Sequence, residues 1–502
     1  MMPERRTSAR STGNAQQANP AAPTPTAADV HVNLIGRTDL TGEIYRQLRQ
    51  AIRDGRLPTG GPLPSSRELA RRLSVSRNTV TAAYDRLTSE GLVAARVGAG
   101  TFVSGSIPDA AGRPWPTSGP LRPRPVWATI PVPTLFQRQA EFDFRTGIPD
   151  ARLFPYQTWR RLVAQALHAE ASDIGVYGDP AGHQGLREAI AHHIGVTRGV
   201  AATGDSVVIT SGTQQAVDVV ARVLLAPGDR VAVENPGYPP PWRLFESLGI
   251  RVAGVPVDRD GLVVDAIPPR SRLVYVTPSH QYPLGMPMSL PRRMALLAWA
   301  RRHDAAIVED DYDSEFRYGG RPIEALHSLD PTGRVLYVGS FSKTMLATLR
   351  LGFVVAPGSL RDAVRAAKYV TDWHTPLPFQ AALARFIEQG LFARHLRRMR
   401  AVYQQRHRRI VHALTHEFAR HLEVVPSVVG LHVTAMARTA TAEAIGEVVR
   451  RASAAGVEVQ PLSMFGVGTQ GPAGLVVGYG AIPTERIEEG LRRLRRCFDV
   501  SA

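Results

Sequence analysis

A proline-rich stretch near residue 120 constrains the fold of this chain more than any other feature. Eight prolines lie between residues 105 and 140, namely Pro108, Pro114, Pro116, Pro120, Pro123, Pro125, Pro131 and Pro133. Because proline lacks an amide donor and blocks helix formation, we predict an extended linker over residues 105–140. A chain of 502 residues is also longer than a single hydrophobic core supports. The sequence therefore predicts a domain on each side of the linker.

Composition narrows the class of protein. The chain has no uninterrupted apolar run of about 18 residues, and residues 1–32 are polar and rich in alanine and proline. We therefore expect a cytoplasmic protein with a disordered tail over residues 1–32 and no membrane segment. The one cysteine, Cys497, excludes an intrachain disulfide and a cysteine-based zinc site, and no metal site is predicted. The formal net charge of +16 favours a polyanionic partner.

Residues 33–104 have the pattern of a small helical domain. Apolar residues recur at helical spacing, and a helix from Arg67, with Ser66 as its cap, is followed by a turn at residues 74–76 and a second helix from Arg77 to about Glu90. Residues 92–103 predict two strands around a glycine-containing tip. The 11 arginines and 6 acidic residues of this segment give it a charge of 11 − 6 = +5. This pattern predicts a DNA-binding helix-turn-helix with a wing, and the alternative is a docking domain with a solvated basic face.

The phrases LPSSRELARRLSVSRNTV and GLVAARVGAGTFV resemble the GntR-type winged helix. The resemblance implies that residues at the start of the second helix meet phosphates and base edges, and that glycines let the wing lie close to the minor groove. The residues assigned to DNA in this way are Arg67, Ser76, Arg77, Asn78, Thr79, Gly98 and Gly100.

From Phe142 onward, helical segments alternate with short β-branched runs. The predicted strands are Ser206–Thr210, Arg230–Val233, Leu273–Thr277, Ala306–Glu309 and Val335–Val338. Such alternation predicts an α/β domain over residues 141–502, with a mainly parallel sheet between helices. Further strands at Gly430–Ala435 and Leu475–Gly478 predict a smaller C-terminal lobe.

Lys343 is the strongest candidate for chemistry in this domain. The chain has two lysines, Lys343 and Lys368, and arginine cannot replace a primary amine as a nucleophile. Lys343 follows a predicted strand, where ligands of open α/β sheets bind, and Ser340 and Ser342 beside it are potential phosphate donors. Taken alone, the tetrapeptide SFSK is equally typical of a surface lysine.

Other residues make a cofactor site more specific. Asp310 follows a buried run, and a carboxylate there could keep a pyridine nitrogen protonated, with Tyr312 beside it. The segment Ser211-Gly212-Thr213 joins a strand to a helix, which suits phosphate, although the same tripeptide is common as an ordinary helix cap. Arg350 adds a cation later in the chain.

Residues 142–502 resemble fold-type I aminotransferases, and with the winged helix they resemble the MocR/GabR-type regulators. The phrases that carry this resemblance are YGDPAGHQGLREAI, ITSGTQQAVDVV, VENPGYPP, VTPSHQYPLGMPMSL, VEDDYDSEFRY and GSFSKTMLATLRLGF. The resemblance implies pyridoxal phosphate as cofactor, held as a Schiff base on Lys343, with Asp310 on the pyridine nitrogen. It assigns the remaining contacts to Tyr312, Ser211, Gly212, Thr213, Tyr238, Ser340, Ser342 and Arg350. It also implies a homodimer in which Tyr177 reaches the phosphate of the neighbouring subunit.

Two departures from the aminotransferase pattern argue against efficient turnover. Tyr282 stands where catalytic relatives have an asparagine, and Val476 lies on the strand that often carries a carboxylate-binding arginine. We therefore predict a regulator that binds operator DNA and controls a neighbouring operon of vitamin B6, amino-acid or amine metabolism. Pyridoxal phosphate or an amine is the expected effector, as in the PdxR-like subgroup. The alternatives are a working aminotransferase with a DNA-binding appendage, and a degenerate domain that dimerises without cofactor.

Overall fold

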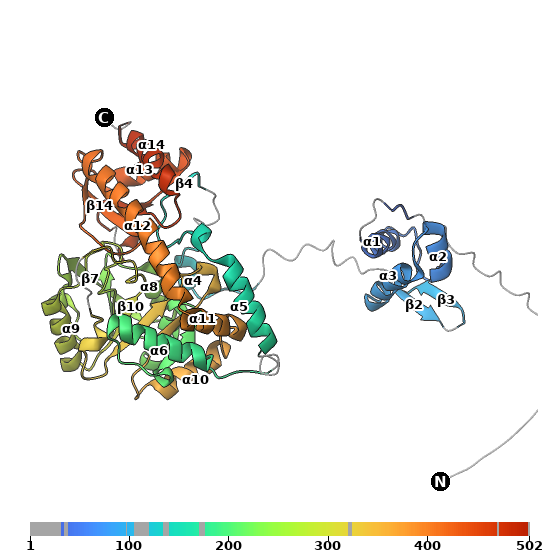
Figure 1. The fold of residues 1–502 in the computed structure, drawn as a ribbon, viewed down its shortest axis with the longest axis horizontal. Coiled ribbons are helices and arrows are strands. Elements are labelled where there is room, and N and C mark those ends of the chain that lie inside the picture. The colour runs from blue at the N-terminus through green and yellow to red at the C-terminus, as the bar shows by residue number, and fades with distance from the viewer. Residues whose placement is uncertain are drawn as a thin grey trace, which may run out of the picture. The chain divides into compact units, whose positions relative to one another are not determined.

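The computed structural model describes residues 32–34, 39–96, 98–104, 120–133, 140–169, 176–319, 324–468 and 471–499. The chain forms two compact units, Met1–Arg122 and Pro123–Ala502 (Figure 1). The predicted tail lies outside the described residues except for Val32, and so does most of the predicted linker. None of the described helices is both long and apolar enough to cross a membrane.

The small unit is a winged helix-turn-helix, as predicted. Its helices and strands are α1 (Leu40–Arg53), β1 (Pro62–Leu63), α2 (Ser66–Leu73), α3 (Arg77–Ser89), β2 (Val93–Arg96) and β3 (Gly100–Val103). Apolar side chains at helical spacing form its core, and Ile44, Leu69 and Val80 are fully buried in it. The strands pair antiparallel in the order β1-β3-β2, so β2 and β3 form the wing.

The helix caps explain where α2 and α3 begin. The predicted cap Ser66 is wrong by one residue: Ser65 has extended backbone angles, and its hydroxyl accepts the amide of Glu68 at 3.2 Å. Ser66 is the first helical residue of α2. Ser76 caps α3 and accepts the amide of Thr79 at 3.1 Å. The turn between the two helices therefore ends on a hydroxyl that fixes the start of the predicted reading helix.

The second half of the linker is not fully extended. Residues 126–129 form the one-turn helix α4 (Val126–Thr129), because the five residues between Pro125, at its N-cap, and Pro131 contain no proline. This helix packs against α8 (Pro239–Ser247) of the large unit. Residues 105–119 and 134–139 of the linker lie outside the described part.

The large unit contains a mixed, mainly parallel sheet of eight strands in the order β5-β12-β11-β10-β9-β6-β7-β8. The predicted strands correspond to β5 (Val207–Thr210), β6 (Arg230–Asn235), β9 (Ser271–Val276), β10 (Ala306–Asp311) and β11 (Val335–Ser340). The strands β7 (Arg251–Asp258), β8 (Gly261–Leu262) and β12 (Gly352–Val355) were not predicted. A central proline interrupts the apolar pattern of β7, and β12 has only four residues. β12 pairs antiparallel with β11 and β5.

Helices cover both faces of this sheet. They are α5 (Tyr156–Ala169), α6 (Gln184–Arg198), α7 (Thr213–Leu224), α8, α9 (Leu290–Arg302), α10 (Arg361–Asp372) and α11 (Leu377–Glu388). On β5, Val207 and Ile209 pack with α5, α6 and α11, whereas Val208 packs with α7 and α10. Because neighbouring strand residues point to opposite faces, each strand contributes to two apolar clusters. The strands are therefore buried on both sides.

A smaller lobe completes the large unit. It contains β13 (Leu422–Val424), β14 (His432–Ala437), α13 (Ala442–Ala454), β15 (Val457–Glu458), β16 (Gln460–Pro461), β17 (Gly474–Gly478) and α14 (Ile487–Asp499). Its antiparallel sheet has the order β13-β14-β17-β16. β4 (Phe142–Asp143) pairs with β15, so the start of the unit joins its end. The long helix α12 (Leu391–His416) contacts α11 and, further along, α14, and Figure 1 shows it connecting the two lobes.

Candidate functional site

A cavity of about 940 Å³ lies at the carboxyl ends of β10 and β11. Its walls come from segments far apart in the sequence, including the starts of α7 and α8, α13 of the small lobe, and Pro131 and Pro133 after α4. Eight of the predicted cofactor residues line it, namely Lys343, Asp310, Tyr312, Thr213, Tyr238, Ser340, Ser342 and Arg350. The position matches the edge at which parallel sheets bind ligands.

Lys343 presents its amine inside this cavity. It follows β11, and its Nζ donates to the carbonyl of Gly147 at 2.9 Å. Burial lowers the pKa of the amine, while the carboxylates of Asp313 and Asp310 oppose that shift. Gly147 has a φ of 79°, and a Cβ there would lie 3.2 Å from Nζ. The chain therefore holds a desolvated primary amine against a backbone that leaves room for it.

Asp310 is the buried acid of the cavity. It lies inside β10, which is two residues longer than predicted. Tyr275 donates to its Oδ2, whereas its Oδ1 is buried and has no hydrogen-bond partner among the described residues. Burial raises the pKa of this carboxyl to about 7. An unpaired buried carboxylate oxygen is costly, so Oδ1 is suited to a donor from a bound ligand.

An anion-binding corner lies at the start of α7. Gly212 caps the helix with a φ of 80°, and Thr213 begins it. The guanidinium of Arg350 donates to the carbonyl of Ser211 at 2.8 Å, and a Cβ on Gly212 would lie 2.8 Å from its Nη2. The backbone amides of a helix start and a cation therefore meet here, which suits phosphate. Ser211 and Gly212 supply backbone to this corner without lining the cavity.

Two serines lie at the carboxyl end of β11. Ser340 ends that strand, and its hydroxyl accepts the amide of Ser342 at 3.1 Å. Both serines line the cavity. This contact leaves the hydroxyl proton of Ser340 free to donate to an anion, as the sequence predicts.

The aromatic residues have different environments. Tyr238 caps α8 in the cavity wall, and burial raises its pKa to about 12. Tyr282 also lines the cavity, but its hydroxyl lies 2.7 Å from that of Thr146. Thr146 in turn donates to Gln460 at 2.7 Å, so Tyr282 uses its own proton within the protein. Tyr177 is 75% exposed, stacks on Trp373 at 4.3 Å, and does not line this chain's cavity.

Sequence reasoning missed several residues of the site. Tyr275 donates a hydrogen bond to Asp310, and His280 contacts Tyr312. Tyr275 lies in a predicted strand and His280 in a phrase that carries the family resemblance, but neither feature indicates these contacts. Arg243 on α8 is different, because its position in the sequence shortly after Tyr238 already makes it a candidate partner for a ligand carboxylate; it lines the cavity and has no hydrogen bond or ion pair with another described residue. Arg450 also lines it but pairs with Glu447 at 2.5 Å. No spacing rule links these positions, because the tertiary fold alone brings them together.

The reading helix of the small unit is exposed. Arg67, Ser76, Arg77 and Asn78 have exposed side chains, and Thr79 is half-buried. Arg77 makes a contact of 3.4 Å with the hydroxyl of Ser66, and the first turn of α3 contains no acidic residue. Gly98 and Gly100 have φ values of 76° and 108°, which favour glycine in the wing. A basic helix start and a narrow wing therefore share one unit, as duplex DNA requires.

Comparisons with known proteins agree with this architecture. The chain matches the family "Aminotransferase class I and II" over residues 143–494 and "Bacterial regulatory proteins, gntR family" over residues 40–103. It is 37% identical to the probable rhizopine catabolism regulatory protein MocR of Rhizobium meliloti, covering 91% of this chain and 93% of that protein. It is 31% identical to the pyridoxine biosynthesis transcriptional regulator PdxR of Corynebacterium glutamicum, covering 88% and 92%.

A solved structure matches the large unit. It is that of LysN, an α-aminoadipate aminotransferase of Thermus thermophilus in complex with N-(5'-phosphopyridoxyl)-L-leucine. The TM-score is 0.68 at 29% identity, with 75% of this chain and 96% of that chain covered. Fold and cavity thus define a fold-type I aminotransferase domain joined to a winged helix-turn-helix. The chain belongs to the GntR family, as a transcriptional regulator of the MocR type.

Proposed function

We propose that the cavity binds pyridoxal phosphate on Lys343, and that the state of the cavity controls binding of the winged helix to operator DNA. The observation that carries the cofactor assignment is the buried, unpartnered Oδ1 of Asp310 in the same cavity as Lys343. When bound, pyridoxal phosphate supplies an aldehyde that condenses with a primary amine and a pyridine ring that withdraws electrons.

Five residues of the cavity have defined roles in this proposal. Lys343 supplies the amine, whose pKa is lowered by burial, so a larger fraction is neutral and nucleophilic. Asp310 accepts the hydrogen of a pyridinium at Oδ1, and the added positive charge returns its carboxyl to the ionised form. Arg350, Thr213 and the start of α7 hold the phosphate. Tyr238 supplies an aromatic wall.

The proposed regulatory output is operator binding by the small unit. Arg67, Arg77, Asn78 and Thr79 contact phosphates and base edges in this proposal, and Gly98 and Gly100 let the wing approach the minor groove. Tyr177 contributes to the cavity of a second subunit in a homodimer, which its 75% exposure allows. A ligand changes operator affinity only if it binds two arrangements of the protein with different affinity.

The effector proposed here is pyridoxal phosphate itself or an amine. Val476 is fully buried in β17 and offers no cation for a ligand carboxylate, and Tyr282 replaces the expected amide donor. Both features favour regulation over efficient transamination. Arg243 supplies a cation in the cavity wall, so amino acids belong in the test panel. The target is proposed to be a neighbouring operon of vitamin B6 or amine metabolism, in line with the name of the relative PdxR.

The cofactor assignment is tested by borohydride reduction of the protein after incubation with pyridoxal phosphate. We expect the added mass on the tryptic peptide that contains Lys343, and none on Lys368, whose side chain is fully buried and paired with Asp372. Label on Lys368 alone would contradict the assignment. Operator binding is then measured with apoprotein, with pyridoxal phosphate, and with a panel of amines and amino acids. A response to one amino acid and none to the cofactor would replace the proposed effector.

A further inference from the structure

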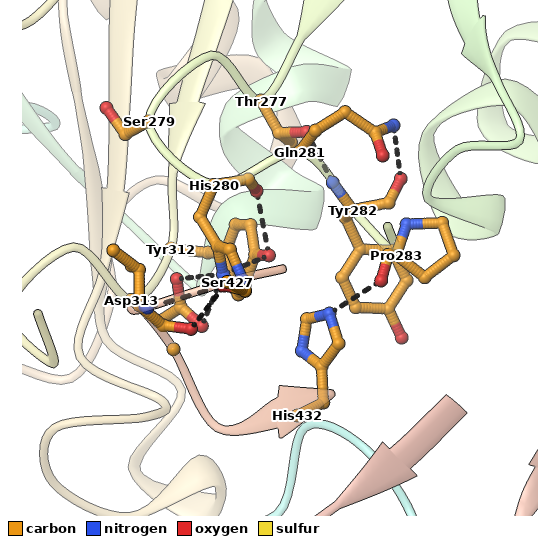
Figure 2. A network of polar contacts seen from close by, with 12 residues as sticks. Thr277, Ser279, His280, Gln281, Tyr282, Pro283, Tyr312, Asp313, Ser427 and His432 are labelled. Carbon is orange, nitrogen blue, oxygen red and sulfur yellow. Dashed lines mark hydrogen bonds and ion pairs between the residues drawn. The ribbon is translucent and has the colours of Figure 1, made fainter. Parts of the chain in front are cut away.

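A buried hydrogen-bonded group outside the predicted site lies directly behind Tyr312. His280, Asp313 and His432 place their polar atoms within 4.8 Å of one another, and all three residues are buried. His280 follows β9 in the loop before Tyr282, and Asp313 follows β10. Figure 2 shows His280 between Asp313 and Tyr312, with His432 turned toward Pro283. None of these three residues has a role in the function proposed above.

The distances assign the proton of His280. Its Nδ1 lies 2.9 and 3.1 Å from the two carboxylate oxygens of Asp313. Because an ionised carboxylate can only accept, Nδ1 carries the hydrogen and Asp313 fixes this tautomer. His432 uses its Nε2 to donate to the carbonyl of Pro283 at 2.9 Å. Protons therefore account for the close contacts of both histidines without a bridging metal ion.

Tyr312 is held by two groups of the same histidine. Its hydroxyl oxygen lies 2.8 Å from Nδ1 of His280 and 2.9 Å from the backbone carbonyl of His280. The carbonyl can only accept, and the Nδ1 hydrogen can be shared between Asp313 and the phenol oxygen. The oxygen is thus fixed in the cavity wall. A ligand anion there would compete with the carbonyl for the tyrosine proton, and a charge-assisted hydrogen bond is the stronger of the two.

The small lobe locks this arrangement. Gly430, in the loop between β13 and β14, has a φ of 88°, and a Cβ there would lie 2.1 Å from Cε1 of His280 and 2.5 Å from Oδ2 of Asp313. The carbonyl of Gly430 accepts the hydroxyls of Tyr318 at 2.7 Å and Tyr479 at 2.6 Å. The imidazole and the carboxylate are therefore clamped by a loop that is itself held in place.

We propose that His280 is a positioning residue for Tyr312: Asp313 holds its ring, and its Nδ1 hydrogen holds the phenol so that the tyrosine proton meets an oxygen anion of the bound cofactor. This inference rests on the proposed binding of pyridoxal phosphate to Lys343. The other titratable groups around Tyr312 are Tyr282, Asp310, Glu234 and, across the cavity, Lys343 and Arg350. They are unchanged in the variants below.

The test uses two replacements of His280 that differ in where they place a donor. In His280→Asn the amide nitrogen occupies the place of Nδ1, whereas in His280→Gln it occupies the place of Nε2. The full-length protein is loaded with pyridoxal phosphate, and its near-visible absorption is recorded as a function of pH. The measured quantity is the midpoint, which is the pH at which the change in absorption is half complete. A hydrogen bond donated to an anion favours the deprotonated form and lowers the pKa, so Tyr312→Phe, which removes the donor, should raise the midpoint by about one pH unit. His280→Gln should match it, and His280→Asn should stay near the wild type.

Matched variants make the result decisive. The double variant His280→Gln with Tyr312→Phe should have the midpoint of Tyr312→Phe alone, because His280 acts through the tyrosine. His432→Gln keeps a donor toward Pro283 and should leave the midpoint unchanged. Equal midpoints for the two His280 variants, or an added shift in the double variant, would overturn the inference. Should His280→Gln not fold, Asp313→Asn must raise the midpoint, because an amide no longer fixes the tautomer, and an unchanged midpoint refutes the inference.

The same spectra separate this inference from the function on which it rests. If wild-type protein gives no near-visible band with pyridoxal phosphate, or if Lys343→Ala keeps it, the cofactor assignment fails. If the wild type shows the band and the variants do not order as stated, only the role of His280 fails. Thermal unfolding of every variant shows whether a shift accompanies loss of structure, which a positioning role does not require.

Discussion

The two candidate sites of this protein place charge in opposite environments. On α3, Arg77 and Asn78 are exposed at a helix start without acidic residues in its first turn. In the cavity, Lys343 and Asp310 are desolvated, and burial shifts the pKa of each toward its neutral form. The exposed charge of the first site suits the proposed polyanion, whereas the buried acid and the half-buried amine of the second site suit the proposed small molecule. In the proposed function, recognition and chemistry therefore belong to two sites that differ in their exposure to solvent.

The largest effect should come from the amine of the buried site. We expect Lys343→Ala to lose the near-visible absorption with pyridoxal phosphate completely, because no second amine lies among the described residues of the cavity wall. Lys343→Arg should lose it as well, since guanidinium keeps the charge but is not a nucleophile. Both variants should still bind operator DNA in a mobility-shift titration. Loss of DNA binding in both, with normal thermal unfolding, would break the separation between the two sites.

The next effect concerns the carboxyl of Asp310. Burial raises its pKa in the folded apoprotein to about 7, from the ordinary value of 3.8 for an aspartate. The folded state therefore binds more protons than the unfolded state between these values, so this group's contribution to stability is present below pH 3.8 and lost as pH rises through 7. In the wild type, the free energy of unfolding should therefore decrease as pH rises over that range. Asp310→Asn should make this decrease smaller, by a few kcal/mol at most.

Denaturant titrations of apoprotein at pH 5 and pH 8 measure this prediction. Glu234 and Glu309, whose pKa values burial also raises to about 7, contribute in the same direction, so the difference between wild type and variant isolates Asp310. Pyridoxal phosphate should remove the difference, because a pyridinium favours the ionised carboxylate. An equal pH dependence in wild type and variant would show that Asp310 is not desolvated as described.

The exposed site should respond differently to its own variants. Asn78→Ala should cost roughly 1–3 kcal/mol of operator affinity at one base position, and Arg77→Ala should lower the slope of log affinity against log salt by about one. Both are measured by fluorescence anisotropy over a salt series. Arg301→Ala, an exposed arginine of α9 in the large unit, is the matched control for the lost charge. If Arg77→Ala binds like the wild type, the assignment of the reading helix is wrong.

The smallest effect distinguishes neighbouring serines. Ser65→Ala should destabilise the small unit by about 1 kcal/mol, because the hydroxyl that caps α2 is lost. Ser66→Ala should change stability by less, since its hydroxyl has only the 3.4 Å contact with Arg77. Thermal unfolding of the two variants decides between them. A larger loss of stability for Ser66→Ala than for Ser65→Ala would indicate that Ser66 is the cap, as the sequence predicts.

Much of this architecture follows from the sequence by itself. The helix spacing around Leu69 and Val80, the turn at residues 74–76 and the strand before Lys343 are set by residues close together in the chain. Local hydrogen bonds, caps and apolar periodicity act over a few residues, so both partners of each interaction lie in one short segment of the sequence. The same holds for the positions of Ser211, Asp310 and Lys343 at the carboxyl ends of β5, β10 and β11, which meet at one edge of the sheet.

The tertiary structure alone decided how these residues are held. Tyr275 holds Asp310, His280 holds Tyr312, and Gly430 clamps His280 from the other lobe, although 150 positions separate the last two residues. The sequence did not place Arg450 in the cavity wall or β12 between β11 and β5. A buried polar group takes whatever partner packing brings within hydrogen-bond distance, and that partner comes from a segment whose position depends on the whole core.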